Sequence, residues 1–551
     1  MSDNTLLSID NLSIALPKGA DRDFAVEGVS FNVNRNEIVC LVGESGSGKS
    51  MTAHAILRLL PEQVRISQGA VNFNGGDIAA ASEAGMRHLR GGEISMIFQE
   101  PLSALNPLTR VGQQIAESII THTKPVPSSA AVDARVQELI GAVGLPDPVA
   151  LARSYPFQLS GGQRQRIMIA MAMANNPALL LADEPTTALD VTTQKQILAL
   201  VKKLQTDRGM GVLLITHDFG VVADVADRVV VMRNGRVVEQ GTVDEVLRHP
   251  KDDYTRSLIA AVPGSRKLAR PDRQIGTEPL LDAFGLSKTF VTSQGLFLPP
   301  RRTAAVQDIS LSLKARETVA IVGESGSGKS TLGRMIMRLI EPDQGSVYFG
   351  GENLLAQRGA GLRAMRRKIQ IVFQDPFAAL DPRQKVGDAI ARGPMAYGTP
   401  KAQAYADAKR LLSRVGLTAS AVERYPHEFS GGQRQRICIA RAIALKPLVL
   451  VADEAVSALD VSVQSQILAL FAELRAEMNL AMIFITHDLR VAAEIADRIV
   501  VMRRGQIVEQ GETQAIFENP SDPYTRALLD AIPGRGMFAG PGARLPEPVG
   551  G

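Results

Sequence analysis

Tryptophan is absent from this 551-residue chain, cysteine occurs only twice, and aromatic residues make up only 4% of the sequence. The two cysteines, Cys40 and Cys438, lie far apart inside apolar segments. They can therefore build neither a disulfide framework nor a cysteine-based metal cluster. We expect both thiols to pack in the core, as free cysteines usually do.

A long hydrophobic run is also missing. The most apolar stretch, 167–182, is interrupted by Asn175-Asn176-Pro177, and it falls short of the ~18 apolar residues that a membrane-spanning helix needs. The N-terminus lacks the charged-then-apolar layout of a signal peptide. We therefore expect a soluble, cytosolic protein, for which any role at a membrane would require partners.

The charge is nearly balanced, with 61 basic and 57 acidic residues and a formal charge of +4. Nucleic-acid binding usually shows as a clustered basic face, so no nucleic-acid partner is expected. Hydrophobic residues make up 45% of the chain, an ordinary value for a globular protein. Because a single core stops growing near ~250–300 residues, we expect two or more domains.

The sequence contains a long-period internal repeat. Gly43–Ser50 returns letter for letter at Gly323–Ser330, and Ser160–Arg166 returns at Ser430–Arg436. Solenoid repeats have periods of about 20–50 residues, far shorter than this interval. The spacing therefore indicates duplicated domains.

The repeat, together with a connecting stretch rich in proline, glycine and charge, sets the expected boundaries. We expect a first domain over 1–264, a linker over 265–279, a second domain over 280–535, and a disordered tail over 536–551.

Each repeat predicts an α/β domain. Continuous apolar runs separated by helical patterns are typical of buried parallel strands. The runs occur at 38–42, 179–182, 212–215, 449–452 and 482–485.

A glycine-rich loop with a phosphate-binding pattern follows the first of these runs. Its glycines allow backbone N–H groups to surround phosphates, Lys49 reaches the β- and γ-phosphates, and the Ser50 hydroxyl is available to Mg²⁺. The predicted loop residues are Gly43, Glu44, Ser45, Gly46, Ser47, Gly48, Lys49 and Ser50, and in the second half Gly323, Glu324, Ser325, Gly326, Ser327, Gly328, Lys329, Ser330 and Thr331.

Two adjacent acids follow a later apolar run in each half. Asp183-Glu184 and Asp453-Glu454 stand at the carboxyl end of a predicted parallel strand, the edge at which such sheets bind ligands. We expect the aspartates to hold Mg²⁺ and the glutamates to polarise the attacking water.

A Ser-Gly-Gly-Gln segment precedes a long helical pattern in each half. The exposed N–H groups and the dipole of a helix N-terminus bind anions, although the segment could also be a simple N-cap. No phosphate in the same half needs a second helix end, whereas a partner domain would use it. The predicted residues are Ser160, Gly161, Gly162 and Gln163, and Ser430, Gly431, Gly432 and Gln433.

The order of these motifs resembles the nucleotide-binding domain of ABC transporters. After the phosphate loop come Gln99, Leu159-Ser160-Gly161-Gly162-Gln163, Asp183-Glu184, Ala188-Leu189-Asp190 and Thr216-His217-Asp218, and the second half repeats the order with Gln374, Phe429 to Gln433, Asp453-Glu454, Ala458-Leu459-Asp460 and Thr486-His487-Asp488. The resemblance implies two tandem P-loop NTPase domains. Each would have a mainly parallel sheet, an antiparallel β subdomain, and a helical subdomain that carries the signature motif.

The resemblance also implies a head-to-tail pair of halves with two composite ATP sites. ATP on Lys49 would be closed by Ser430 and Gly432, and ATP on Lys329 by Ser160 and Gly162. The implied catalytic residues are Glu184, His217, Glu454 and His487, with His217 and His487 at the γ-phosphate. The implied Mg²⁺ ligands are Ser50, Gln99, Asp183, Ser330, Gln374 and Asp453.

The two halves differ at a few positions. Ala455-Val456-Ser457 replaces Pro185-Thr186-Thr187, and Met171 stands where the second half has Arg441. Both halves keep their lysine, acids and histidine, so we expect two active sites. Phe24 and Phe290 are candidates for the aromatic that stacks on adenine, but they do not align with each other.

The segments 249–258 and 519–528 resemble the C-terminal element of the oligopeptide, dipeptide, opine and nickel importer ATPases, and 295–302 resembles an insertion of that group. The fused arrangement is similar to peptide importers of the microcin C type. This implies an ATP-hydrolysing subunit of a bacterial peptide importer, peripheral on the cytoplasmic face of the inner membrane. Its partners would be two transmembrane permeases and a periplasmic or lipid-anchored binding protein. Peptide, opine, glutathione and nickel all stay open as substrates.

Three rival functions are alternatives to the importer. A ribosome-acting translation factor would carry a long charged helical linker, and a DNA-repair ATPase would carry coiled coils with sustained heptads; the sequence has neither. In a fused sugar-importer ATPase one half often loses its catalytic residues. The translation factor is the main alternative function.

Overall fold

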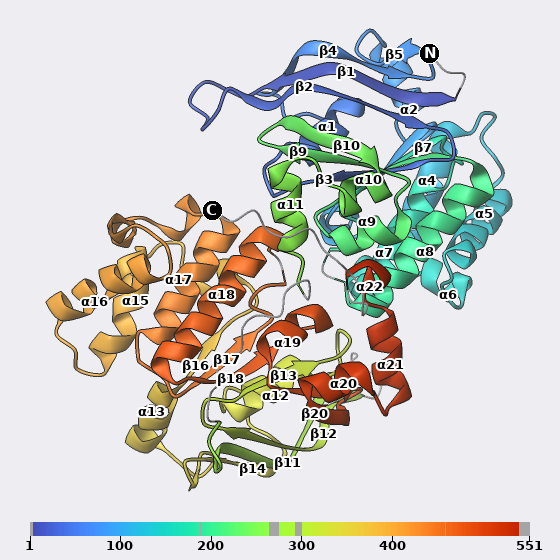
Figure 1. Ribbon diagram of the computed structural model, residues 1–551. Helices are drawn as coiled ribbons and strands as arrows, with labels where there is room; N and C mark the ends of the chain where they lie inside the picture. Colours follow the sequence, from blue (N-terminus) through green and yellow to red (C-terminus); the bar gives the residue numbers. More distant parts are fainter. Residues whose placement is uncertain (1–3, 188, 264–274, 293–299, 458, 539–551) are drawn as a thin grey trace. The chain divides into compact units, whose positions relative to one another are not determined.

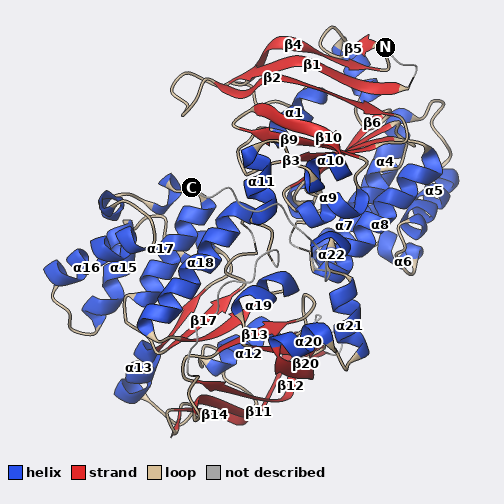
Figure 2. Ribbon diagram, in the orientation of Figure 1, coloured by secondary structure: helices blue, strands red, loops and turns tan. Residues whose placement is uncertain are grey.

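The computed structural model describes residues 4–187, 189–263, 275–292, 300–457 and 459–538 of the chain (Figures 1 and 2). The chain divides into two compact units: the first comprises Met1–Leu189, Thr193–Ser265 and Pro533–Gly551, and the second Asp190–Thr192 and Arg266–Ile532. Most of the expected linker, most of the expected tail, positions 295–299 of the insertion, and Ala188 and Ala458 lie outside the described residues.

Each unit contains two sheets. In the first unit a four-stranded antiparallel sheet has the order β2-β1-β4-β5, and a six-stranded sheet has the order β10-β9-β3-β8-β7-β6. Within the larger sheet, β10 runs antiparallel to β9 and the other neighbours are parallel. The strands are β1 (Thr5–Ala15), β2 (Phe24–Asn34), β3 (Ile38–Val42), β4 (Arg65–Phe73), β5 (Gly76–Asp77), β6 (Ile94–Ile97), β7 (Leu179–Asp183), β8 (Gly211–Thr216), β9 (Arg228–Arg233) and β10 (Arg236–Thr242).

The second unit repeats this topology. Its sheets have the orders β12-β11-β14-β15 and β16-β17-β18-β13-β19-β20, again with an antiparallel edge strand, β20, in the larger sheet. The strands are β11 (Pro279–Thr292), β12 (Arg301–Lys314), β13 (Thr318–Val322), β14 (Gln344–Phe349), β15 (Glu352–Asn353), β16 (Ile369–Val372), β17 (Val449–Asp453), β18 (Ala481–Ile485), β19 (Arg498–Arg503) and β20 (Gln506–Glu512).

The central strands confirm the α/β prediction from the apolar runs. Every residue of β3, β7, β8, β17 and β18 is buried, as expected for parallel strands that are covered on both faces. Cys40 in β3 is buried, as is Cys438, and burial raises the pKa of the Cys438 thiol to about 11. Both cysteines therefore pack in the core as predicted.

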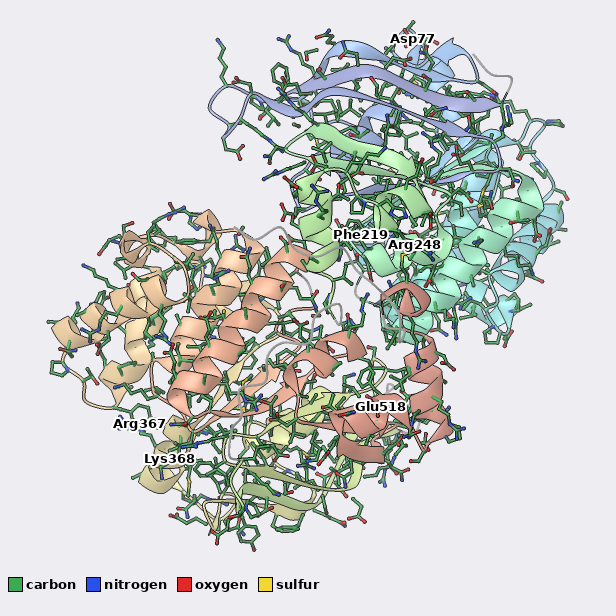
Figure 3. The ribbon with its side chains drawn as sticks, in the orientation of Figure 1. Asp77, Phe219, Arg248, Arg367, Lys368 and Glu518 are labelled. Atoms are coloured by element: carbon green, nitrogen blue, oxygen red, sulfur yellow. The ribbon has the colours of Figure 1, made fainter. Side chains whose placement is uncertain are left out.

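Helices make up most of the remaining regular structure (Figure 2). Those of the first half are α1 (Lys49–Ile56), α2 (Glu83–Leu89), α3 (Pro101–Ala104), α4 (Val111–His122), α5 (Ser129–Ala142), α6 (Pro148–Ala152), the 3₁₀ turn η1 (Pro156–Gln158), α7 (Gly161–Ala172), α8 (Val191–Arg208), α9 (Phe219–Val225), α10 (Val243–Arg248) and α11 (Asp253–Ala260). The first residue of α9, Phe219, is buried in the unit (Figure 3).

The second half contains the corresponding helices. They are α12 (Lys329–Ile336), α13 (Gly359–Lys368), α14 (Pro376–Ala379), α15 (Val386–Ala396), α16 (Lys401–Arg414), the 3₁₀ turns η2 (Ala419–Glu423) and η3 (Pro426–Glu428), α17 (Gly431–Ile443), α18 (Val461–Met478), α19 (Leu489–Ile495), α20 (Thr513–Glu518) and α21 (Pro523–Asp530), followed by α22 (Arg535–Phe538). Within the described part of the chain, none of the helices combines the length and the apolar character that a membrane crossing requires.

Candidate active site

The glycine-rich loop connects β3 to α1 and requires glycine at two positions. Gly43 has φ +149°, and a Cβ there would lie 2.2 Å from the Met232 carbonyl oxygen. Gly48 caps α1 with φ +103°, and its Cβ would lie 2.7 Å from the Ala25 carbonyl oxygen. Glycine adopts both conformations without steric cost. The loop therefore packs closely against β9 and β2, and the second half repeats this geometry.

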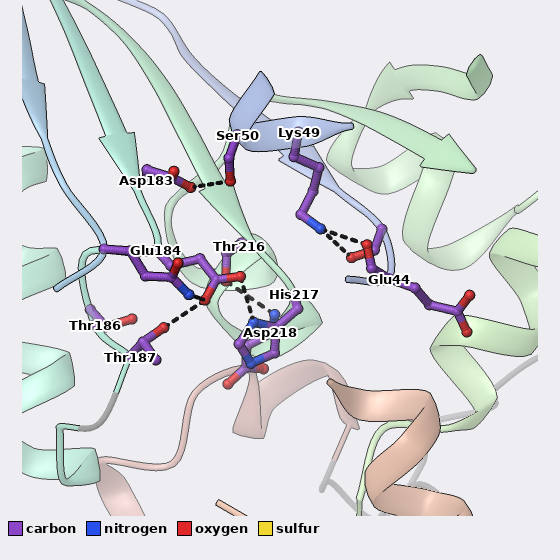
Figure 4. Close-up of polar contacts among 12 residues, drawn as sticks. Glu44, Lys49, Ser50, Asp183, Glu184, Thr186, Thr187, Thr216, His217 and Asp218 are labelled. Atoms are coloured by element: carbon purple, nitrogen blue, oxygen red, sulfur yellow. Dashed lines mark hydrogen bonds and ion pairs between the residues drawn. The ribbon is translucent and has the colours of Figure 1, made fainter. Parts of the chain in front are cut away.

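The loop lysine is buried and turned into its own loop (Figure 4). Lys49 Nζ donates hydrogen bonds to the carbonyl oxygens of Gly43 and Glu44, both at 2.8 Å. In the second half Lys329 makes the two equivalent bonds at the same 2.8 Å. Burial lowers the pKa of Lys329. The loop carbonyls thus hold an ammonium group inside the loop for which the sequence predicts phosphate binding.

A serine hydroxyl and an aspartate meet where the loop enters its helix. Ser50 Oγ donates to Asp183 Oδ1 at 3.1 Å, and Ser330 Oγ donates to Asp453 Oδ1 at 2.7 Å. Each aspartate is the last residue of its strand, and burial raises the pKa of both carboxyls. Hydroxyl and carboxylate oxygens are the hard donors that Mg²⁺ prefers. The pair therefore fits a magnesium ion that is also bound by phosphates.

The glutamate that follows each aspartate has a left-handed backbone. Glu184 has φ +46° and Glu454 has φ +47°. The Glu184 N–H donates to the Ile215 carbonyl at 3.0 Å, which ties the turn to β8. Non-glycine residues rarely adopt this conformation, and strain of this kind concentrates at functional sites. The two halves keep the same turn even though their next three residues differ.

The Glu184 carboxylate accepts hydrogen bonds from three sides (Figure 4). Gln99 Nε2 and Thr187 Oγ1 both donate to Oε2 at 2.9 Å, and His217 Nδ1 lies 3.0 Å from Oε1. Burial alone would raise the pKa of Glu184, but the hydrogen bond and charge of His217, helped by Thr187 and Lys49, lower it to about 2. Burial opposes protonation of His217, yet the Glu184 carboxylate raises its pKa. The pair therefore favours a carboxylate beside a protonated imidazole.

The second half forms the same cluster with one altered contact. Gln374 Nε2 donates to Glu454 Oε2 at 2.8 Å, and His487 Nδ1 lies 3.5 Å from the same oxygen. Ser457 Oγ donates to the Glu454 backbone carbonyl at 3.0 Å, in place of the Thr187 contact. Burial opposes ionisation of Glu454, but His487 and Lys329 lower its pKa. Both halves thus bring together the lysine, serine, aspartate, glutamate, glutamine and histidine that the sequence predicts.

The signature segment begins a helix in each half. Ser160 caps α7: its hydroxyl accepts from the Gln163 N–H at 3.3 Å, and Gln163 Oε1 accepts from the Ser160 N–H at 2.9 Å. A Cβ on Gly162 would lie 2.7 Å from Thr193 Cγ2, so α7 packs closely at this point. The segment around Ser430 forms the same cap on α17. Closure of a nucleotide by the signature helix of the other half stays a prediction.

Arg441, Phe24 and Phe290 are the remaining residues to which the sequence analysis drew attention. Arg441 Nη1 donates to the Ala379 carbonyl at 2.5 Å, a bond that Met171 cannot make in the first half. Phe24 precedes Ala25, whose carbonyl approaches the phosphate loop, whereas Phe290 lies on β11, a strand that corresponds to β1. The two candidates for the adenine-stacking aromatic therefore lie on strands that do not correspond, in line with their unaligned sequence positions.

Sequence reasoning missed two contributors to the site. Thr187 supplies a direct hydrogen bond to the Glu184 carboxylate, and Tyr254 contacts the phosphate loop through its hydroxyl. Tyr254 lies in a segment that recurs at Tyr524, so the internal repeat is a signal that could have indicated its role.

Family models match both halves of the chain. The model described as ABC transporter matches residues 26–187 and 306–457. The model described as oligopeptide/dipeptide transporter, C-terminal region, matches residues 238–292 and 508–537.

Curated relatives align with nearly the full chain. The glutathione import ATP-binding protein GsiA of Escherichia coli (strain K12) is 46% identical over 575 residues, which cover 99% of this chain and 91% of that protein. GsiA of Salmonella choleraesuis is 47% identical over 561 residues, which cover 96% of this chain and 89% of that protein.

Solved structures include a dimeric ATP-binding cassette in a post-hydrolysis state bound to ADP and Pi, with a TM-score of 0.40 and 29% identity, covering 43% of this chain and 99% of that chain. From the family models and the full-length relatives, this chain belongs to the ABC transporter family as an ATPase with two fused ATP-binding cassettes, each followed by an oligopeptide/dipeptide transporter C-terminal region.

Proposed function

We propose that this chain hydrolyses Mg²⁺-ATP at two sites and thereby drives uptake of peptides or related small solutes through a membrane importer. The observation that carries the proposal is the duplicated cluster in which a buried loop lysine, a serine–aspartate pair and a glutamate–histidine pair surround one loop. Phosphoryl transfer requires mainly positioning and charge neutralisation, and this set of groups supports both.

Oxygen atoms at the end of each loop would hold the magnesium ion. In the first half these come from Ser50 and Asp183, and in the second half from Ser330 and Asp453. Gln99 and Gln374, which donate to the adjacent glutamates through Nε2, would add their side-chain oxygens. Bound Mg²⁺ would supply charge neutralisation at the β- and γ-phosphates. The N–H groups of the loop and the N-terminus of α1 would hold the phosphates, with Lys49 supplying a positive charge.

Glu184 and Glu454 would orient the attacking water. A carboxylate with a pKa of about 2, as in Glu184, is fully ionised at neutral pH and accepts a hydrogen bond from water. It is a weak base, so we propose that it positions the water more than it stores the proton. His217 holds the carboxylate on one side and would contact the γ-phosphate with its other nitrogen.

The signature helices would complete the sites in trans. The first-turn N–H groups of α7 and α17 form positively polarised ends that suit a γ-phosphate. We propose that Ser160 and Gly162 close the nucleotide on Lys329, and that Ser430 and Gly432 close the nucleotide on Lys49. Closing both sites would then bring the halves together only when ATP is present.

The transported solute and the partners are proposed from the relatives. The GsiA relatives are glutathione import proteins, and the oligopeptide/dipeptide C-terminal regions favour peptide-like substrates. We propose two transmembrane permeases, a periplasmic or lipid-anchored binding protein, and a peripheral position at the cytoplasmic face of the inner membrane. These C-terminal regions also favour the importer over the ribosome-acting alternative.

Equivalent cavities beside α2 and α13 are the proposed permease surfaces. The first, of about 640 Å³, is lined by groups that include His88, Glu93 and Arg135. The second, of about 700 Å³, is lined by Arg363, Arg367, Lys368 and Lys446 and has no acidic group among its lining residues. Arg367 and Lys368 are the last two residues of α13 (Figure 3). Because the two linings differ in charge, the halves could distinguish two permeases, with the more acidic permease segment at the second half.

Reconstitution tests the function directly. The chain is assembled with its candidate permeases and binding protein in proteoliposomes, and ATP-dependent accumulation of labelled glutathione and of a labelled dipeptide is measured. We expect accumulation of at least one solute with the native chain and none when both Lys49 and Lys329 are changed to alanine. ATP hydrolysis with neither solute accumulated, together with co-sedimentation of the chain with ribosomes, would contradict the proposal.

A further inference from the structure

A tyrosine from the C-terminal region reaches the phosphate loop in each half. The N–H of Glu44, the second loop residue, donates to Tyr254 Oη at 3.2 Å. In the second half the N–H of Glu324 donates to Tyr524 Oη at 3.1 Å. These tyrosines lie on α11 and α21, outside the segments matched by the ABC transporter model.

Tyr254 contacts the phosphate loop at Glu44, the residue whose carbonyl also binds Lys49. The Glu44 carbonyl accepts a hydrogen bond from Lys49 Nζ at 2.8 Å, while the Glu44 N–H donates to the tyrosine. The tyrosine hydroxyl therefore restrains the backbone of Glu44 through a group other than the one that binds the lysine. A rotation of this residue would move the carbonyl that holds the ammonium group.

The tyrosine ring is fixed from the sheet side. Tyr254 is 7% exposed, and the guanidinium carbon of Arg233 lies 4.7 Å from the centre of its ring. Arg233 ends β9 and directly follows Met232, whose carbonyl faces Gly43. The second half has the same arrangement, with Arg503 lying 4.7 Å from the ring centre of Tyr524. The strand end thus contacts both the loop and the tyrosine.

The start of the helix is fixed as well. Asp252 accepts a hydrogen bond from the Tyr254 N–H at 2.8 Å, and Glu239 of β10 accepts from the Lys251 N–H at 2.7 Å. Asp522 and Glu509 make the corresponding bonds in the second half. Two copies of the same chain of contacts, from β10 or β20 to the phosphate loop, make an incidental packing contact a poor explanation.

The hydroxyl stays neutral over the physiological range. Burial raises the pKa of Tyr254 to about 12 and that of Tyr524 to about 12. Each hydroxyl therefore accepts the loop N–H as a neutral group, and the bond does not depend on pH near neutrality.

We propose that Tyr254 and Tyr524 are positioning residues through which the oligopeptide-type C-terminal region sets the ATP affinity of its own half. This inference rests on the proposed phosphate-binding role of the loop. The region would act on nucleotide binding through the direction of the loop lysine and leave the glutamate–histidine pair unchanged.

The test replaces both tyrosines with phenylalanine, which keeps the rings and their arginine contacts. Loss of one hydrogen bond changes an equilibrium constant by about 2- to 12-fold. We expect the KM for ATP, and the Kd for ATP and ADP, to rise by up to that factor in Tyr254→Phe/Tyr524→Phe, with kcat unchanged. The Kd for AMP should stay the same because the lysine reaches only the β- and γ-phosphates.

Tyr405→Phe is the matched control, since this hydroxyl donates to Asp388 in the helical part of the second half. We expect native ATP affinity from it. An unchanged KM in the double variant, a fall in kcat alone, or an equal change in Tyr405→Phe would overturn the inference. Activity of the native chain, and its loss in Lys49→Ala/Lys329→Ala, tests the proposed function separately.

Discussion

Replacing Glu184 and Glu454, the two glutamates proposed to orient the attacking water, with glutamine should separate ATP binding from ATP hydrolysis. In the native chain Gln99 and Thr187 donate to Glu184 Oε2, each at 2.9 Å. In Glu184→Gln the amide oxygen can take the place of Oε2 and keep both donors. In the native chain His217 Nδ1 lies 3.0 Å from Glu184 Oε1. In the variant the amide nitrogen takes the place of Oε1 and donates to the neutral imidazole of His217. The local contacts therefore survive the substitution, and the phosphate loop is untouched.

The substitution acts on the attacking water. An amide presents no negative charge to orient and polarise the nucleophile. Removing one preorganised electrostatic group costs about 10²–10³-fold in kcat, so turnover of Glu184→Gln/Glu454→Gln should fall by about that factor. This corresponds to about 3 to 4 kcal/mol of activation free energy.

Two measurements on the same preparation test this prediction. Phosphate release at saturating Mg²⁺-ATP gives turnover, and titration with a fluorescent ATP analogue gives affinity. We expect turnover to be lost and affinity to stay within a few-fold of the native value. Glu518→Gln, an exposed change at the end of α20 (Figure 3), is the control and should hydrolyse ATP normally. Native turnover in the double variant would refute the role assigned to the glutamates.

Two further predictions concern packing and pH. Gly432→Ala places a Cβ 2.5 Å from Val463 Cγ1, whereas a Cβ on Gly431 meets nothing within 4 Å. Thermal unfolding should therefore show a lower Tm for Gly432→Ala and a native Tm for Gly431→Ala. Equal Tm values for the two variants would contradict the close packing of α17 at Gly432. The pKa of Glu184 falls from 4.5 to about 2 on folding, which corresponds to about 3 kcal/mol of stability above pH 4.5. That stability should disappear as the pH drops from 4.5 to about 2. The free energies of unfolding of the native and Glu184→Gln chains, measured in urea, should therefore converge in this range. A difference between the two free energies that does not change with pH would contradict the pairing of Glu184 with His217.

The parallel core could be predicted because its strands carry a simple signal. The run 38–42 matches β3 residue for residue, since a strand buried on both faces needs an unbroken apolar sequence. The conformation of the glycine-rich loop was equally predictable, because its pattern requires glycine where the backbone is left-handed or closely packed, as at Gly43 and Gly48. The acids at the end of β7 followed from the rule that ligands bind at the carboxyl edge of parallel strands.

Other features depend on contacts that no local pattern reports. The bond between Tyr254 and the loop joins residues 210 positions apart, so only the folded chain brings them together. Glu184 has a left-handed backbone, a conformation that glutamate seldom adopts. The sequence around Glu184 therefore does not predict this conformation. The bond from Thr187 to the Glu184 carboxylate depends on that same turn. Functional strain and long-range hydrogen bonds thus account for most of what sequence reasoning missed.

Closure of each ATP by the signature helix of the opposite half is the central proposal, and paired substitutions test it. Lys49→Ala with Ser430→Arg should disable one composite site and spare the other. Lys49→Ala with Ser160→Arg should disable both.

Each pair of substitutions is introduced into the Glu184→Gln/Glu454→Gln chain, which is expected not to hydrolyse ATP. The measurement is the number of ATP molecules retained per chain after rapid desalting. We predict one retained ATP for Lys49→Ala/Ser430→Arg and none for Lys49→Ala/Ser160→Arg. The reverse result, with one ATP retained only by Lys49→Ala/Ser160→Arg, would show that each half encloses its own nucleotide and would contradict the account.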